Sequence, residues 1–242
     1  MGCTCFVIGS KPEVYFPEDS PCVVVGVNGA LSRAHEISKK HGSEVFWVVS
    51  EHVFREKFKK TLSEVTGCSC KKAMLIPASS GRCPGATDIY ASRVDADEVR
   101  VISRRYRELV LVRALGFVKF TRLMVKVYGV VSTAKRLFRY SILLDESRLL
   151  KVSNGVFALA LFLSQSRKLV DVNIDKFVLV GCGINSGSAH WYDKDHLYGV
   201  SHTLEDFVYM KALIEKYGSR MISVSDIEFA SAVQSNSPLG GG

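Results

Sequence analysis

The sequence predicts an α/β protein with a mostly parallel sheet flanked by helices. Three observations predict this class. Short, strongly apolar runs typical of buried strands alternate with longer stretches that have helical spacing. The strands end at glycine or polar residues, as turns between strands and helices do. The 242 residues are 47% apolar and 23% charged, a composition that excludes disordered chains, collagen-like repeats and coiled coils.

Four buried strands are expected in the first ninety residues, each followed by a turn. They are Cys5–Ile8, Cys22–Val27, Val45–Val49 and Ala73–Pro77. Ala30–His41 has helical spacing and a basic last turn, and Gly42 follows it in the position of a C-cap. Glu51–Val65 has the spacing of a second helix. Ligands of parallel sheets bind beyond the carboxyl ends of the strands, so residues 1–90 are predicted to form a nucleotide-binding half.

The C-terminal part returns to alternating helices and strands. The expected elements are helix Asn154–Ser164 with Ser153 or Asn154 as N-cap, strand Lys176–Val180, helix Thr203–Tyr217 and strand Met221–Val224. We therefore predict a second α/β half over residues 151–239, in which the loop Ile184–Ser201 serves as an active-site lid. The glycines of residues 240–242 are expected to be an expression tail. No run of 18 apolar residues occurs, so no membrane span is predicted.

The stretch between the two halves, residues 91–150, is predicted to be a basic helical insertion. Residues 99–140 hold eleven lysines and arginines but one acid, Glu108, a local charge of +10 in a chain whose net charge is +8. Apolar residues interleave with these cations at helical spacing. Such amphipathic helices often lie on an anionic membrane or line a cleft for an anionic ligand. The alternative is an ordinary pair of helices with a solvated basic face.

The seven cysteines do not indicate a disulfide framework, because their number is odd and their spacing is uneven. Cys3/Cys5 and Cys68/Cys70 are C-x-C pairs, whereas zinc sites more often have two to four intervening residues. We therefore expect reduced thiols in a cytoplasmic protein.

The densest group of reactive side chains lies between Gly181 and Asp206. It contains His190, Trp191, Tyr192, Asp193, Asp195, His196, Tyr198, His202, Glu205 and Asp206. A histidine can take a proton from a sugar hydroxyl at neutral pH, and tyrosine hydroxyls can hydrogen-bond a leaving phosphate. A metal site built from the histidines and aspartates is the competing interpretation, although no H-E-x-x-H spacing occurs.

Five short motifs, in order along most of the chain, carry a resemblance to a known family. They are Val7-Ile8-Gly9-Ser10-Lys11-Pro12, Val24-Val25-Gly26-Val27-Asn28, Val45-Phe46-Trp47, Val152-Ser153-Asn154-Gly155-Val156 and Leu179-Val180-Gly181-Cys182-Gly183-Ile184. In this order the chain resembles the small bacterial sialyltransferases and related CMP-sugar transferases. The resemblance implies a Rossmann-like fold, the sialyltransferase-like variant with a single nucleotide-binding domain.

The resemblance also implies roles for individual residues. Gly9, Ser10 and Asn28 would hold cytidine monophosphate, and Ser50 stands where the family has an asparagine. Ser153, Asn154 and Gly155 would contact the donor, and Gly181 is a further candidate for donor binding. Asn154 replaces the serine that the family places before Gly155. Tyr192 and Tyr198 would stabilise the departing phosphate, and His202 would be the general base. If the reaction retains the anomeric configuration, a carboxylate such as Asp206 or Asp193 must serve as nucleophile.

The expected activity is therefore transfer of a 2-keto acidic sugar, such as sialic acid or Kdo, from a CMP-sugar to a bacterial surface glycan or glycolipid. No metal or other cofactor and no nucleic acid is expected, and a homo-oligomer is allowed for. The protein is expected to be peripheral on the inner face of the membrane, with residues 99–140 on the anionic surface. The alternatives are a nucleic-acid-binding module, a metal-dependent hydrolase built on Asp193, Asp195 and histidines, and a nucleotide-binding protein without catalysis. A second Asp-x-Asp, Asp95-Ala96-Asp97, is expected to lead into a helix.

Overall fold

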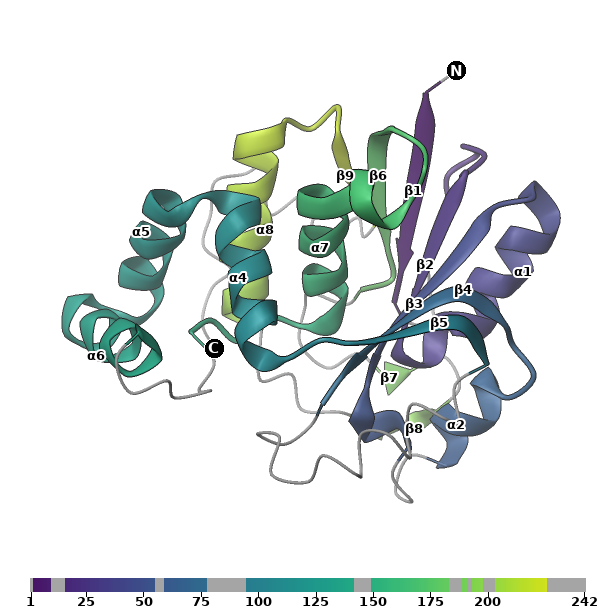
Figure 1. Cartoon of the computed structure of the whole chain (residues 1–242), viewed down its shortest axis with the longest axis horizontal. Helices are drawn as coiled ribbons and strands as arrows, with labels where there is room; N and C mark the ends of the chain where they lie inside the picture. Colours follow the sequence, from purple (N-terminus) through teal and green to yellow (C-terminus); the bar gives the residue numbers. More distant parts are fainter. Residues whose placement is uncertain are drawn as a thin grey trace.

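The computed structural model confirms the α/β class: it contains a seven-stranded, all-parallel, Rossmann-like sheet flanked by helices (Figure 1). The structure describes residues 2–9, 16–54, 59–77, 95–141, 149–182, 189–190, 193–197 and 203–225. The strand order across the sheet is β5-β4-β3-β2-β1-β6-β9. The strands are β1 Cys3–Ile8, β2 Val23–Val27, β3 Glu44–Ser50, β4 Cys70–Ile76, β5 Ala96–Val101, β6 Ile174–Val180 and β9 Ile222–Val224.

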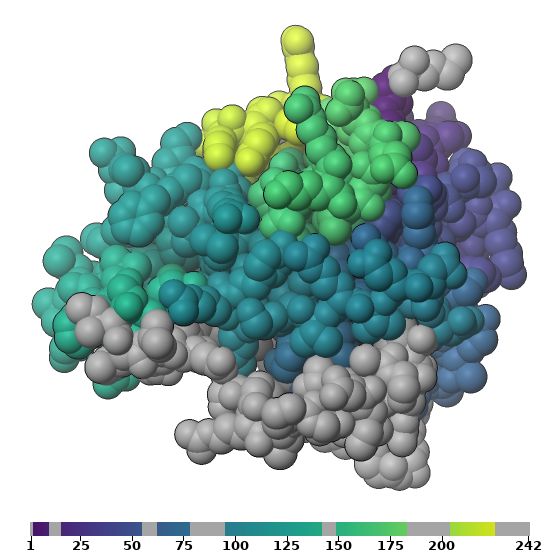
Figure 2. Space-filling model, in the orientation of Figure 1, coloured from purple at the N-terminus to yellow at the C-terminus, as the bar shows by residue number. Residues whose placement is uncertain are grey.

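Helices cover both faces of this sheet (Figure 1). One face carries α1 (Leu31–His41) and α2 (Lys59–Val65), and short 3-10 turns, Asn28–Ala30 and Glu51–Phe54, follow β2 and β3. The other face carries α4 (Arg104–Leu115), α7 (Asn154–Leu169) and α8 (Thr203–Tyr217). Beyond them, α5 (Phe117–Tyr128) and α6 (Val130–Ser141) form one end of the molecule (Figure 2).

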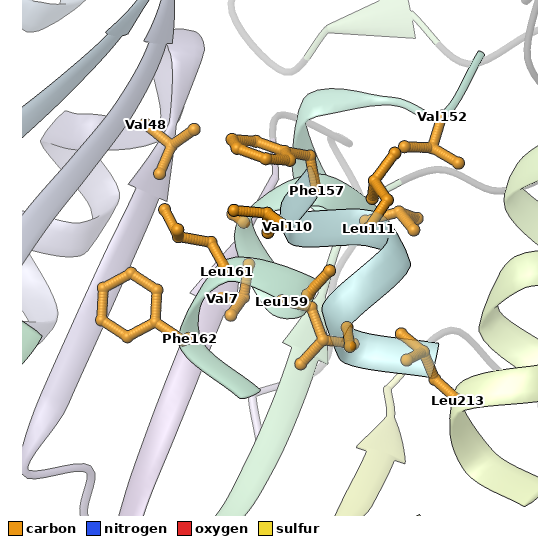
Figure 3. Close-up of a cluster of buried hydrophobic side chains, with 14 of the residues drawn as sticks. Val7, Val48, Val110, Leu111, Val152, Phe157, Leu159, Leu161, Phe162 and Leu213 are labelled. Carbon is orange, nitrogen blue, oxygen red and sulfur yellow. The ribbon is translucent and has the colours of Figure 1, made fainter. Parts of the chain in front are cut away.

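The central strands are buried on both faces, which explains their continuous apolar sequences. In β1, Cys5 and Val7 belong to the core under α7, while Phe6 and Ile8 belong to the core under α1. Helix α7 lies directly against the sheet, and its Leu161 and Phe162 point toward the strands (Figure 3). Phe162 meets Phe46 edge to face at 5.3 Å between ring centroids. This is why α7 is apolar on nearly all sides, unlike a surface helix.

Most strands and helices lie where the sequence predicted them. The segment predicted as the loop Ile184–Ser201 differs in that it contains two short paired strands, β7 (Ala189–His190) and β8 (Asp193–Leu197). Two other predicted elements also differ. Residues Glu51–Val65 are not one helix, because a 3-10 turn ends at Phe54 and α2 begins at Lys59. The residues after Asp95 form the edge strand β5 and not a helix. The sequence of β5 is charged because a sheet edge leaves most of its side chains in solvent. Gly42 has the left-handed φ of 69° expected of a C-cap.

The basic segment is not confirmed as an insertion. Helix α4 is part of the layer on α7, and its Arg107 and Glu108 are each only 1% exposed. Only α5 and α6 extend away from the sheet. The eleven cations of residues 99–140 look alike in the sequence, but the structure buries Arg107 and leaves others exposed. Arg107 is buried because α4 packs against the core on more than one side. No helix among the described residues is long and apolar enough to cross a membrane.

The expectation that all cysteines are reduced is wrong for two of them. Cys3 and Cys22 form a disulfide, with 5.7 Å between their Cα atoms. Strands β1 and β2 are parallel neighbours in which Cys5 pairs with Val23, so the two cysteines meet at the amino edge of the sheet. The sequence separation of 19 residues gave no indication of this contact, because it arises from the pairing of the strands.

Candidate functional site

The order of the strands reverses direction between β1 and β6, which makes this position the topological switch point of the sheet. From β1 the sheet grows outward to β5, and the chain then returns to place β6 on the other side of β1. Ligands of open parallel sheets bind at the carboxyl end of such a switch point. Here the two strand ends are joined closely: the Gly9 N–H donates to the Val180 carbonyl at 2.8 Å.

Glycine is required at position 9 by this close approach. A Cβ atom on Gly9 would lie 2.3 Å from the carbonyl oxygen of Gly181 and 2.6 Å from the Cα atom of Cys182. Both are backbone atoms, which cannot rotate away as a side chain can. The first residue of the motif Gly9-Ser10 is therefore a glycine for steric reasons. Ser10 lies outside the described residues.

The N-terminus of α7 lies against this switch point. Ser153 is the N-cap, and its hydroxyl accepts a hydrogen bond from the Val156 N–H at 3.4 Å. A Cβ atom on Gly155 would lie 2.7 Å from the Cys182 sulfur, so the first turn of α7 touches the end of β6. The N–H groups of Asn154 and Gly155 have no acceptor among the described residues. A helix start with unused N–H groups favours an anion such as phosphate or carboxylate.

Asn28 connects the ends of β2 and β3 to α7. Its Oδ1 accepts hydrogen bonds from the Ser50 N–H at 3.0 Å and from the Asn154 Nδ2 at 3.2 Å. Its backbone carbonyl accepts from the Trp47 indole N–H at 2.7 Å, and its φ is 51°. Asparagine tolerates this left-handed conformation better than most residues. The side-chain NH₂ of Asn28 has no acceptor among the described residues, so it can donate to a ligand.

Two buried charged side chains, Asp206 and Arg107, hold the start of α7 in place. The Asp206 Oδ1 accepts from the Ser153 N–H at 2.7 Å, and the Arg107 guanidinium donates to the Val152 carbonyl. The same guanidinium lies 5.2 Å from the centre of the Phe157 ring. Asp206 is 1% exposed, and no donor among the described residues reaches its Oδ2. We therefore assign Asp206 a positioning role, because a buried carboxyl cannot meet a substrate in this arrangement.

Burial raises the pKa of Asp206 from its ordinary value of 3.8 to about 7, against the smaller lowering effects of Ser153 and Arg107. The folded protein thus retains a proton that the unfolded chain loses. The free energy of unfolding is therefore expected to fall by up to about 4 kcal/mol from this group as the pH rises from about 4 to about 7, and the contribution is level above that.

Urea denaturation across this pH range should test the titration of Asp206. Asp206→Asn keeps an oxygen for the Ser153 N–H but does not titrate, so the variant should lack this part of the pH dependence. The relevant quantity is the difference between wild type and variant, since other carboxyl groups contribute to both curves. Parallel curves would contradict a raised pKa at Asp206.

The structure brings together eight of the residues predicted to form the site. They are Gly9, Asn28, Ser50, Ser153, Asn154, Gly155, Gly181 and Asp206. The predicted Ser10, Tyr192, Tyr198 and His202 lie outside the described residues. Sequence reasoning did not single out Trp47, Cys182 or Arg107 as parts of this site. The sequence held one hint about Arg107: it directly precedes Glu108, the single acid of the basic stretch.

The two Asp-x-Asp motifs have different positions. Asp95 and Asp97 lie at the amino end of β5, whereas the α7 N-terminus lies at the carboxyl edge of the parallel sheet. Asp193 and Asp195 lie in β8 (Asp193–Leu197), which pairs with β7 (Ala189–His190). The structure describes the backbone of these two aspartates but not their side chains. Among the residues that the structure describes, no group of three or more His, Cys, Asp or Glu side chains could hold a metal ion.

An open depression of about 270 Å³ lies far from this site, lined by Arg167 in the last turn of α7 and by residues 170–173 between α7 and β6. It is at the amino edge of the sheet, where none of the converging polar groups is found.

No family model, curated protein or solved structure matches the chain. A helix N-terminus, the side-chain NH₂ of Asn28 and the close approach of β1 and β6 lie together at the carboxyl edge of the sheet.

Proposed function

We propose that the protein is a glycosyltransferase that moves a 2-keto acidic sugar, such as sialic acid or Kdo, from a CMP-sugar to a glycan or glycolipid. One observation carries the proposal: Asn28 and the N-terminus of α7 are hydrogen-bonded to each other beside the switch point of the sheet. An amide donor suited to a nucleoside thus lies next to N–H groups suited to an anion. A CMP-sugar presents a nucleoside, a phosphate and a sugar carboxylate within this span.

The proposed reaction is displacement at the anomeric carbon of the donor. An acceptor hydroxyl oxygen forms the new bond to this carbon, the bond from the carbon to the phosphate oxygen breaks, and CMP leaves with the electron pair. His202 takes the proton of the acceptor hydroxyl. Tyr192, Tyr198 and the N–H groups at the start of α7 offset the charge on the departing phosphate. CMP leaves as a monophosphate, so these donors can act without a metal ion.

Thermal denaturation with nucleotides tests the first half of this proposal. CMP at about 100 times its dissociation constant should stabilise the folded protein by about 2.7 kcal/mol, which raises the melting temperature by about 5 to 10 °C in a chain of this size. UMP, GDP and ADP should give smaller shifts. No shift with CMP at millimolar concentration would contradict the proposal, and equal shifts with all four would indicate a general phosphate site.

Asn28→Asp provides the matched variant for this measurement. Aspartate has nearly the same shape and still accepts hydrogen bonds from the Ser50 N–H and the Asn154 side chain. It replaces the NH₂ donor by a negatively charged oxygen beside the proposed phosphate site. The variant is therefore expected to remain folded and to lose the shift with CMP. A full shift in this variant would show that Asn28 does not face the nucleotide.

A further inference from the structure

Helices α5 and α6 form a hairpin whose outer surface combines cations with exposed apolar side chains; we call it the basic hairpin (residues 117–141). Five large apolar residues are exposed on it: Phe117, Val118, Val130, Val131 and Phe138. Val130 and Val131 are each 69% exposed, and Phe117 is 63% exposed. The opposite side of the hairpin is part of the core, where Phe120, Leu123 and Met124 are buried. The apolar residues outside are thus additional to those that fold the hairpin.

The cations of the basic stretch do not all contribute to this surface. Arg107 is buried, the Arg100 guanidinium lies 5.1 Å from the centre of the Tyr106 ring, and that of Arg136 lies 4.0 Å from the centre of the Tyr128 ring. The exposed cations of the hairpin are Lys119, Arg122, Lys126, Lys135 and Arg139. The sequence has no acid between Glu108 and Asp145. The surface is therefore uniformly positive and carries apolar side chains among its charges.

We propose that the basic hairpin docks on an anionic lipid bilayer. Its cations attract acidic headgroups, and its exposed Phe and Val side chains enter the boundary between headgroups and acyl chains. A second copy of the chain fits this surface poorly, because a symmetric contact would bring cations against cations. Nucleic acid fits less well than lipid, because three of the five exposed apolar residues are valines, which offer no stacking surface for bases.

The hairpin is linked to the candidate site by a short chain of contacts. The Tyr128 hydroxyl, stacked under Arg136, donates to Glu205 Oε1 at 3.2 Å. Glu205 precedes Asp206, which accepts from the N-cap of α7. Docking thus holds the carboxyl edge of the sheet close to the bilayer. If the proposed transferase function is correct, on which this last point rests, the acceptor is a glycan attached to lipid.

Flotation with phosphatidylcholine vesicles, with and without phosphatidylglycerol, tests the docking. The protein should float with the anionic vesicles and much less with the neutral ones, and added salt should weaken binding. The neutralised variant combines Lys119→Gln, Arg122→Gln, Lys126→Gln and Lys135→Gln. Each removed cation should weaken binding about five-fold, so the four together should weaken it several hundred-fold.

A control variant removes the same number of charges elsewhere, through Lys39→Gln, Lys40→Gln, Arg167→Gln and Lys168→Gln. These exposed residues lie at the ends of α1 and α7, away from the hairpin. The control should bind like wild type. Equal loss in both variants, or no binding of wild type to anionic vesicles, would overturn the proposal. All eight positions are exposed, so both variants are expected to fold. Melting temperatures equal to that of the wild type would show this.

Phe117→Ser with Phe138→Ser separates the apolar contribution from the charges. This pair should lower binding to anionic vesicles even at high salt, where attraction between charges is screened. Two further results would overturn lipid docking: a dimer without lipid that the neutralised variant breaks, or binding to an oligonucleotide that displaces the protein from vesicles. Vesicle binding is measured without nucleotide and the CMP shift without lipid, so the docking and the transferase function can fail separately.

Discussion

Replacing His202 by alanine is expected to lower the rate of sugar transfer by about 10²- to 10⁴-fold and to leave the CMP-induced rise in melting temperature unchanged. The loss is large because the acceptor hydroxyl must give up its proton as it attacks the donor. His202 immediately precedes α8, and the first turn of α8 places Asp206 against the N-cap of α7. Helix α8, which begins one residue after His202, thus borders the candidate site.

The measurement is initial transfer rate with CMP-sialic acid or CMP-Kdo as donor, together with thermal denaturation with CMP. His190→Ala is the matched control, because this histidine belongs to the same stretch of chain and has no assigned role. It should retain most of the rate. A His202→Ala protein that transfers sugar at the wild-type rate would exclude the general-base role. Loss of the CMP shift in that variant would assign His202 to donor binding.

Replacing Gly9 by alanine is expected to lower the free energy of unfolding by about 3 kcal/mol or more, the upper part of the range for forcing extra volume into a packed interior. The added Cβ atom would be 2.3 Å from the Gly181 carbonyl oxygen, and only a movement of β1 away from β6 could relieve that contact. Because the same movement would open the switch point, the CMP shift should be lost as well.

Gly67→Ala is the control for this result. Gly67 has a φ of 80° and no atom within 4 Å of an added Cβ, so its substitution tests the backbone conformation without a steric clash. It should cost about 1 to 2 kcal/mol and leave CMP binding intact. Urea denaturation of both variants makes the comparison. If Gly9→Ala costs no more than Gly67→Ala, the close approach of β1 and β6 is not as tight as the structure has it.

Much of the fold was predictable because the relevant signals are local. The runs that became β1, β2, β3 and β6 are apolar on both sides, as strands buried under two helical layers must be. Gly42 and Ser153 marked a helix end and a helix start by conformational and capping preferences that act over one turn. β5 was missed because an edge strand buries few side chains, so its sequence lacks that apolar signal.

Part of the candidate site was also predictable, for a reason of topology. Asn28 and Ser50 follow neighbouring strands, and the carboxyl ends of parallel strands share one edge, so their proximity followed from the predicted sheet. The hydrogen bond between Asn28 and Asn154 did not follow, because 126 residues separate them and only the packing of α7 on the sheet brings them together. Arg107 was counted as a surface cation, although it lies buried near Asp206.

The sequence by itself determined the α/β class, the positions of the buried strands and the polar residues at their ends. These properties depend on burial and on backbone preferences, which are written into neighbouring residues. Only the tertiary structure decided which cations are buried, that Cys3 meets Cys22, and that exposed apolar side chains lie among the cations of the basic hairpin. Those outcomes depend on how β1 pairs with β2 and on how α4, α5 and α7 pack, and contacts between distant segments leave little trace in local sequence.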